Sequence, residues 1–336
     1  MVVLLVALLA LGAGAERARI SERTGPPMTP KGAWVCVTEE AAFSPRDTAE
    51  GVVFDGKMWL SNGYYHGHVL SRDLWWSKDG AGWTLVNAAT PYDGYSEMVA
   101  YQGAMWAIKG SVWRSTDGVE WTQVCERTPF GVRGYGEVAV HEGRMWQLGS
   151  GADVWHSTDG KTWTCATAQA PYGERRAAAV AAFRGRLWVM GGYVHAPNTP
   201  LEKHYPEFTT HNDVWSSADG VHWERVPAHA PWSPRMWFAA QVHAGRLWVV
   251  GGFDNANGAN LGDVWTTEDG VHWEEFVSEK TFSPRHEPTC YTYDGSLWVA
   301  AGNSWPVRND VWRLTLEGDD AASAGAPDTG QGRGAE

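Results

Sequence analysis

The chain has 336 residues, a net charge of -12 and no cluster of basic residues. An acidic protein without a basic patch lacks the electrostatic footprint of a nucleic-acid-binding protein. Its longest apolar run lies at the N-terminus and is shorter than the roughly 20 residues that span a bilayer. We therefore expect no nucleic-acid partner and no membrane span.

Both ends of the chain differ in composition from the middle. Residues 1–15 are apolar and uncharged and end in Ala13-Gly14-Ala15, the small-residue pattern that precedes signal-peptidase cleavage. We expect a signal peptide over 1–15 and a secreted or periplasmic protein, with an extended leader over 16–32. Residues 317–336 are rich in Gly, Ala and Asp, which predicts a disordered tail. One folded domain over 33–316 remains.

The tryptophans reveal an internal repeat within that domain. Of the 22 tryptophans, all but Trp76, Trp232, Trp237 and Trp305 fall into three series. The first series follows a glycine turn, at Trp59, Trp106, Trp146, Trp188, Trp248 and Trp298. The second lies in DVW-like segments, at Trp75, Trp113, Trp155, Trp215, Trp265 and Trp312. The third follows an Asp-Gly turn, at Trp83, Trp121, Trp163, Trp223 and Trp273, with its remaining counterpart, Trp34, at the N-terminus.

Each repeat predicts four short strands, A to D, because β-branched and aromatic runs alternate with Gly, Asp, Pro and Asn turns. The Asp-Gly pairs, such as Asp159-Gly160, predict hairpins of two or three residues between strands C and D. Six copies predict an all-β, six-bladed β-propeller of four-stranded blades, because radial stacking covers both apolar faces of each sheet. The strand near Trp34 should close the last blade by pairing near Val311 to Leu314.

The order of strand B, diglycine and DVW segment over 33–316 resembles the kelch repeat of galactose-oxidase-like propellers. Gly191-Gly192 and Gly251-Gly252 carry the diglycine, and the first three repeats depart from it. The resemblance therefore implies the architecture and no single subfamily. The turns between strands C and D, such as Ser157 to Trp163, also resemble a shortened Asp-box of sialidase propellers, which we interpret as a structural hairpin device.

A site is expected at the end that carries the B to C loops and the D to A connections, because loop variation concentrates there. These loops are shortest in blades two and three, which predicts a lopsided rim and a cleft. The longest, Tyr193 to Asn212 in blade four, is predicted to form a wall or lid. The candidate ligand-binding aromatic and histidine side chains are Tyr64, His66, Tyr193, His195, Trp237 and Trp305.

One arginine recurs before strand A in every blade except the second. The five candidates are Arg46, Arg133, Arg175, Arg235 and Arg285. We expect them to point toward the channel mouth, where guanidinium groups would bind an acidic carbohydrate bidentately. The alternative is a structural role, in which each arginine ties adjacent blades through backbone carbonyls. Glu50, Glu97 and Glu137 align in strand A and are candidates for acid or base roles.

Neither metal nor cofactor is expected, because the histidines show no metal-binding spacing. Copper-oxidase chemistry of the galactose-oxidase type would need His and Tyr ligands and a Tyr–Cys cross-link, for which Cys290 is the one inner-strand candidate. Cys36 and Cys290 should lie three strand spacings apart, about 14 Å, too far for a disulfide. We expect these two thiols, with Cys125 and Cys165, to be free.

The leading interpretation is a monomeric recognition module that binds a glycan or a protein at its loop-rich face. One alternative is a carbohydrate-active enzyme, such as a sialic acid mutarotase or a sialidase, and the other is a copper oxidase. Paired carboxylates near an arginine cluster would favour the first alternative. Two histidines with a tyrosine within metal range would favour the second.

Overall fold

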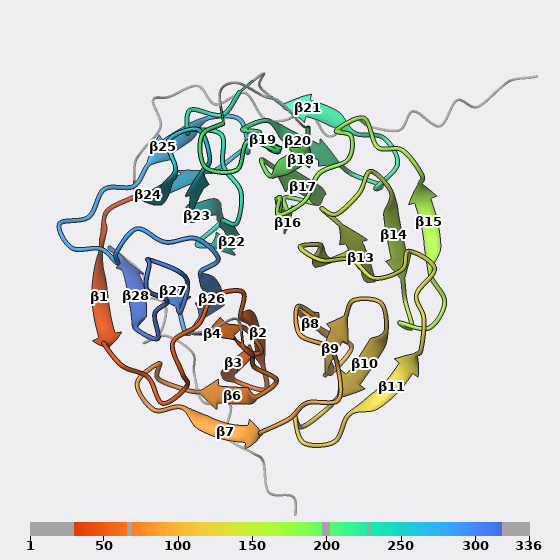
Figure 1. Ribbon diagram of the computed structural model, residues 1–336, viewed down its shortest axis with the longest axis horizontal. Coiled ribbons are helices and arrows are strands. Elements are labelled where there is room, and N and C mark those ends of the chain that lie inside the picture. The colour runs from red at the N-terminus through yellow and green to blue at the C-terminus, as the bar shows by residue number, and fades with distance from the viewer. Residues whose placement is uncertain (1–29, 66–68, 197–201, 227–228, 318–336) are drawn as a thin grey trace, which may run out of the picture.

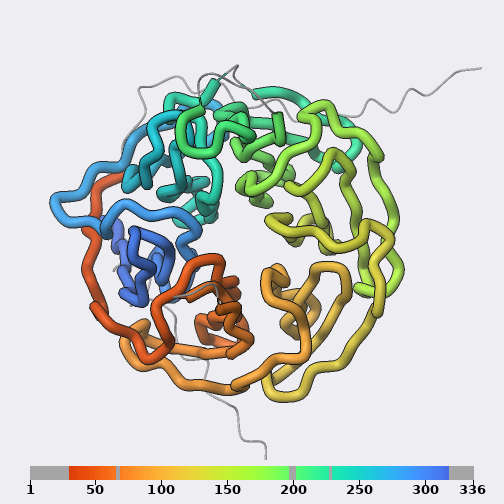
Figure 2. The backbone as a smooth tube through the Cα atoms, viewed as in Figure 1, coloured from red at the N-terminus to blue at the C-terminus, as the bar shows by residue number. Residues whose placement is uncertain are grey.

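The computed structural model describes residues 30–65, 69–196, 202–226 and 229–317. These residues form six antiparallel four-stranded sheets around a central axis (Figures 1 and 2). The chain is a six-bladed β-propeller, as predicted. The expected signal peptide, the leader up to residue 29 and the tail from residue 318 lie outside the described residues. Within the described ranges, no helix is long and apolar enough to cross a membrane.

Blades 1 to 3 follow one another along the chain, each running from the axis outward. Blade 1 consists of β2 (Glu50–Phe54), β3 (Lys57–Ser61), β6 (Leu74–Ser77) and β7 (Thr84–Asn87). Blade 2 consists of β8 (Glu97–Tyr101), β9 (Ala104–Ile108), β10 (Val112–Ser115) and β11 (Thr122–Cys125). Blade 3 consists of β12 (Glu137–His141), β13 (Arg144–Leu148), β14 (Val154–Ser157) and β15 (Thr164–Thr167).

Blades 4 and 5 repeat this order, whereas blade 6 takes its outer strand from the N-terminus. Blade 4 consists of β16 (Ala179–Phe183), β17 (Arg186–Met190), β20 (Val214–Ser217) and β21 (Glu224–Val226). Blade 5 consists of β22 (Ala239–His243), β23 (Arg246–Asp254), β24 (Ala259–Thr267) and β25 (Trp273–Glu275). Blade 6 consists of β26 (Thr289–Tyr293), β27 (Ser296–Ala300), β28 (Val311–Leu316) and β1 (Gly32–Thr38).

Two further hairpins lie in the B to C loops. β4 (Tyr64–Tyr65) pairs with β5 (Val69–Leu70) in blade 1, and β18 (Tyr193–His195) pairs with β19 (Phe208–Thr210) in blade 4. Both hairpins extend the rim beyond the four-stranded sheets.

The N-terminal strand closes the ring. β1 pairs with β28, with Trp34 opposite Leu314 and Cys36 opposite Trp312. The strand order β1-β28-β27-β26 places β1 at the outer edge of blade 6 (Figure 1). The predicted closure is confirmed.

The Asp-Gly segments are structural hairpin devices, as interpreted from the sequence. In blade 1, the Gly80 N–H donates to Oγ of Ser77 (2.9 Å), and Oδ1 of Asp79 accepts the Gly82 N–H (2.8 Å). A Cβ on Gly80 would come within 2.4 Å of Trp298 in the neighbouring blade, so only glycine fits here. The connection is longer than the expected two- or three-residue turn, because residues 78–83 join β6 to β7.

Each blade also contains one aromatic pair that explains the third tryptophan series. A ring from the D to A connection meets the strand D tryptophan edge to face, an arrangement that stabilises beyond simple burial. The centroid distances lie between 4.4 and 5.2 Å. The pairs are Phe43–Trp83, Tyr92–Trp121, Phe130–Trp163, Tyr172–Trp223, Trp232–Trp273 and Phe282–Trp34.

The four cysteines are free thiols, as predicted. Cys36 in β1 and Cys290 in β26 lie on opposite edges of blade 6. Burial raises the pKa of the Cys290 thiol to about 12, so this thiol stays protonated at neutral pH.

Candidate functional site

The five candidate arginines are paired with aspartates inside their own blades. In blade 6, Nη1 of Arg285 lies 2.7 Å from Oδ1 of Asp310, and Nη2 lies 2.8 Å from Oδ2. Nη1 also donates to the carbonyl oxygen of Ala301 (2.7 Å). Oδ2 of Asp310 accepts the indole N–H of Trp312 at 2.8 Å. The five pairs are Arg46–Asp73, Arg133–Asp153, Arg175–Asp213, Arg235–Asp263 and Arg285–Asp310.

The expectation that these guanidinium groups point toward the channel mouth is therefore wrong. Their donors are directed to an aspartate and a carbonyl of the same blade, and Arg46, Arg235 and Arg285 have no exposed surface. The role is structural, although the side chain joins parts of one blade instead of two neighbours. The backbone of Arg285 does link blades, because its carbonyl accepts the N–H of Gly252 in blade 5 (2.9 Å).

The central channel begins with a ring of six residues, one from each blade. Each lies two residues before strand A and has a positive φ, between 49° and 61°. The six are Thr48, Tyr95, Tyr135, Ala177, Trp237 and Glu287. Left-handed backbone is unfavourable for residues other than glycine, and such conformations cluster at functional sites. Here the conformation places six side chains at the entrance of the channel.

The next layer of the channel is formed by the first residues of the inner strands. Blades 1, 2 and 3 contribute Glu50, Glu97 and Glu137, whereas blades 4 and 5 contribute alanines. All three glutamates line a cavity of about 240 Å³. The three carboxyl groups therefore lie on one side of the channel.

The three glutamates interact closely. Burial raises the pKa of Glu50 to about 7. Burial and the neighbouring Glu50 and Glu137 carboxylates raise the pKa of Glu97 well above its usual value. Glu97 and Glu50 are hydrogen-bonded to each other, so the two carboxyl groups share a proton. Burial, with a contribution from Glu50, also raises the pKa of Glu137.

Above the channel lies a wider pocket of about 530 Å³, a size typical of small-molecule sites. Its wall is aromatic, and its floor is polar. The aromatic residues are Tyr64, Tyr65, Tyr135, Tyr205, Trp237 and Trp305. The polar residues are Asp47, Thr48, His286, Glu287 and Asn303. This pocket and the channel cavity share Thr48, Tyr135, Trp237 and Glu287, so the two spaces adjoin.

The blade 4 insertion forms part of the pocket wall. Its Tyr205 is fixed by Asn255 of blade 5, whose side-chain amide donates to the Tyr205 carbonyl and accepts its N–H, both at 2.9 Å. The ring of Tyr205 meets Trp237 edge to face at 5.7 Å. His204 packs against Trp305 at 5.7 Å, which ties the insertion to blade 6. The described part of the insertion thus reaches the channel mouth through Tyr205.

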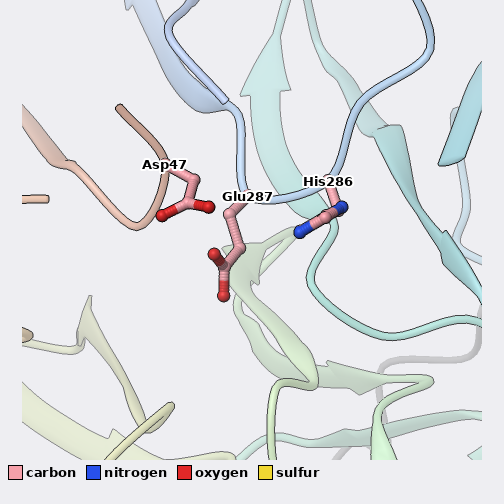
Figure 3. A group of neighbouring side chains, drawn as sticks. All are labelled: Asp47, His286 and Glu287. Atoms are coloured by element: carbon pink, nitrogen blue, oxygen red, sulfur yellow. The ribbon is translucent and has the colours of Figure 1, made fainter. Parts of the chain in front are cut away.

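Three polar groups on the pocket floor lie close together (Figure 3). One ligand atom from each of Asp47, His286 and Glu287 lies within 4.8 Å of the other two. Oγ1 of Thr48 donates to Oε2 of Glu287 (2.7 Å), and Nδ2 of Asn303 donates to Oδ2 of Asp47 (2.8 Å). Burial and the nearby Asp47 raise the pKa of Glu287 to about 8, and burial lowers the pKa of His286 to about 4.

Only some of the remaining ligand-binding residues predicted from the sequence line the pocket. Tyr64, Trp237 and Trp305 line the pocket. Tyr193 is buried and stacks on Phe208 at 4.2 Å outside the pocket. His195 is exposed on β18 and also contacts Phe208. His66 lies outside the described residues.

Sequence reasoning missed most of the pocket floor and the channel ring. Asp47 and His286 follow the repeated arginine by one residue, and Tyr135 and Glu287 follow it by two. An alignment of the repeats could therefore have located the site, because residues one or two positions after each repeated arginine lie on the pocket floor or in the channel ring.

Comparisons with known proteins agree with the fold. No family model matches the sequence, and no curated protein matches it. The solved structure of YjhT aligns with a TM-score of 0.63 and 13% sequence identity, covering 83% of this chain and 99% of that chain. At this identity the likeness shows the propeller fold alone.

Proposed function

We propose that this protein recognises a carbohydrate in the pocket at the channel mouth. The observation that carries the proposal is the composition of the pocket, an aromatic wall over a floor of carboxyl, imidazole and amide groups. Aromatic faces pack against the C–H faces of sugar rings, and the floor groups can exchange hydrogen bonds with hydroxyls. The positive-φ ring supports a functional role, because strained backbone of this kind concentrates at binding sites.

The charge of the pocket favours a neutral or amino sugar over an acidic one. Neither cavity has an arginine or lysine among its lining residues. The Asp47 carboxylate would repel a sugar carboxylate. The five arginines that suggested an acidic ligand are occupied by aspartates within the blades.

A glycan array with the purified protein tests this proposal. Neutral or amino sugars should bind, and sialylated or uronic acid glycans should not. Exclusive binding of acidic glycans would contradict the charge argument. Failure of every glycan class to bind would favour a protein ligand at this face.

A second function, that of a carbohydrate-active enzyme, is favoured by one observation. Glu97 and Glu50 are hydrogen-bonded to each other inside the channel that adjoins the pocket. Two carboxyls in this relation hold one proton between them and can supply an acid and a base at the same pH. Mutarotation of a sugar needs such a pair, because one proton leaves the anomeric hydroxyl and another is delivered to the ring oxygen.

NMR exchange spectroscopy of the sugar anomers tests this second function. Wild-type protein should accelerate anomer interconversion, and Glu97→Gln should abolish the acceleration while leaving sugar binding intact. Binding without acceleration in the wild type would leave recognition as the function and exclude mutarotation of that sugar.

Copper-oxidase chemistry does not fit the described residues. Among them, the one compact group of three or more His, Cys, Asp and Glu side chains contains a single histidine and no cysteine. Galactose-oxidase-type copper needs His and Tyr ligands with a Tyr–Cys cross-link. Cys290 lines the channel cavity but belongs to no such group.

A further inference from the structure

The floor of the pocket contains three side chains whose geometry suits a single cation. Asp47 comes from the connection into blade 1, and His286 and Glu287 come from the connection into blade 6 (Figure 3). Their ligand atoms lie within 4.8 Å of one another. The centre of a triangle with 4.8 Å sides lies about 2.8 Å from each corner, so shifts below about 1 Å would bring all three within coordination distance.

The hydrogen bonds of His286 fix which ring nitrogen is available. Nδ2 of Asn260 donates to the carbonyl oxygen of Asn303 (2.8 Å), which can only accept. The amide oxygen of Asn260, Oδ1, therefore accepts a hydrogen bond from the Nδ1–H of His286, with 2.6 Å between the two atoms. Nε2 is left with its lone pair, as in the carbonyl-oriented histidines of metal sites.

That lone pair is directed into the group of carboxylates. His286 is only 7% exposed, and Figure 3 shows one ring nitrogen turned toward Glu287. Among the described residues Nε2 has no hydrogen-bond partner. This nitrogen and the carboxyl groups of Asp47 and Glu287 therefore face one another across the pocket floor, at distances that a single cation could bridge.

We propose that Asp47, His286 and Glu287 bind a divalent first-row transition-metal cation, of the Mn²⁺ or Zn²⁺ type. One imidazole nitrogen and two carboxylates form a donor set that suits these ions. Ca²⁺ fits less well, because it takes oxygen ligands alone. The three protein ligands leave coordination positions that open into the pocket, where water or a ligand oxygen can bind.

This inference goes beyond carbohydrate recognition and is tested with the metal alone. The full protein is stripped with EDTA, dialysed and titrated with Mn²⁺ by calorimetry. One Mn²⁺ should bind per chain. The variant Asp47→Asn/Glu287→Gln should bind at least tenfold more weakly, because two of the three ligands lose their charge. The control Glu120→Gln/Glu126→Gln removes the same charge from exposed positions and should bind like the wild type.

A spectroscopic measurement on the unmodified protein complements the variants. Electron spin-echo envelope modulation of bound Mn²⁺ should show coupling to one imidazole nitrogen, and His286→Gln should remove it. The proposal is overturned by absence of Mn²⁺ binding, by binding that survives the double variant, or by a spectrum without nitrogen coupling. If the double variant does not fold, the spectrum of the wild type decides alone.

Discussion

Arg235 and Asp263 meet side by side in blade 5, with Nη1 2.8 Å from Oδ1 and Nη2 2.7 Å from Oδ2. Arg235 has no exposed surface, and its Nη1 also donates to the Gly251 carbonyl (2.9 Å). The guanidinium group therefore joins the connection into strand A, the diglycine and strand C of this blade. Such a bidentate pair has the geometry of strong charge-assisted hydrogen bonds.

Removal of this arginine should destabilise the protein. We expect Arg235→Ala to lower the free energy of unfolding by about 3 kcal/mol or more, because Asp263 would remain without its partner. The free energy of unfolding of Arg235→Lys should lie between those of the wild type and Arg235→Ala, since lysine keeps the charge but not the bidentate geometry. Urea unfolding measures the effect, with the exposed Arg127→Ala as control. An unchanged midpoint in Arg235→Ala would show that the pair is not structural.

The closure of blade 6 predicts a sharp difference between two truncated chains. A chain that begins at residue 30 keeps β1, whereas a chain that begins at residue 40 lacks it. The longer chain should unfold cooperatively near the temperature of the full protein. The shorter chain should unfold at a much lower temperature and aggregate, because β28 would become an exposed edge and the Phe282 ring would lose Trp34. Equal melting temperatures would contradict the closure by β1.

The channel glutamates predict a pH-dependent gain of stability in Glu50→Gln. The pKa of Glu50 is raised from 4.5 to about 7 by burial. Between these two pH values the folded state keeps the Glu50 proton, whereas the unfolded state loses it. The contribution of Glu50 to stability is therefore complete below pH 4.5 and is lost as the pH rises through 7. At pH 8 the free energy of unfolding of Glu50→Gln should be about 3 kcal/mol higher than that of the wild type. At pH 4 the two values should be nearly equal.

Chemical denaturation at both pH values, with EDTA present, measures this difference. Glu120→Gln is the exposed control and should show none. A variant that is no more stable than the wild type at pH 8 would mean that Glu50 ionises without cost in the channel.

The cysteine assignment predicts four reactive thiols. Titration of denatured, non-reduced protein with a thiol reagent should find all four groups. In the native protein Cys165, which is exposed, should react first, and Cys290, whose thiol has a pKa of about 12, should react last. A titre of two or fewer would show a disulfide and require a different arrangement of the outer strands.

The repeat was readable from the sequence because each tryptophan of a series has the same surroundings in every blade. Trp59 and Trp298 each pack on the Asp-Gly glycine of the next blade, so neither glycine tolerates a side chain. The role of the arginines was also readable. Blade 2 lacks the arginine and has Ser111 where the other blades have the paired aspartate, so the two losses occur together.

The site itself was only partly readable. Aromatic loop residues such as Trp305 could be assigned to the correct end, because strand order fixes which loops share a face. The polar floor depends on ring closure, which brings Thr48 within 2.7 Å of Glu287, 239 positions away. No spacing rule along the chain predicts such a contact. The pKa values of the channel glutamates likewise depend on the fold, because three separate blades bring these side chains together and bury them.

Trp305 is the residue best suited to testing whether the aromatic pocket at the channel mouth binds a sugar. This side chain lines the pocket yet is 50% exposed, so Trp305→Ala should still fold. The measurement is calorimetric titration of the best glycan from the array into wild type, Trp305→Ala and Leu85→Ala, the last 45% exposed on the outer strand β7. We predict a loss of about tenfold or more in affinity for Trp305→Ala and none for Leu85→Ala. Equal affinities in all three proteins would contradict the placement of the site.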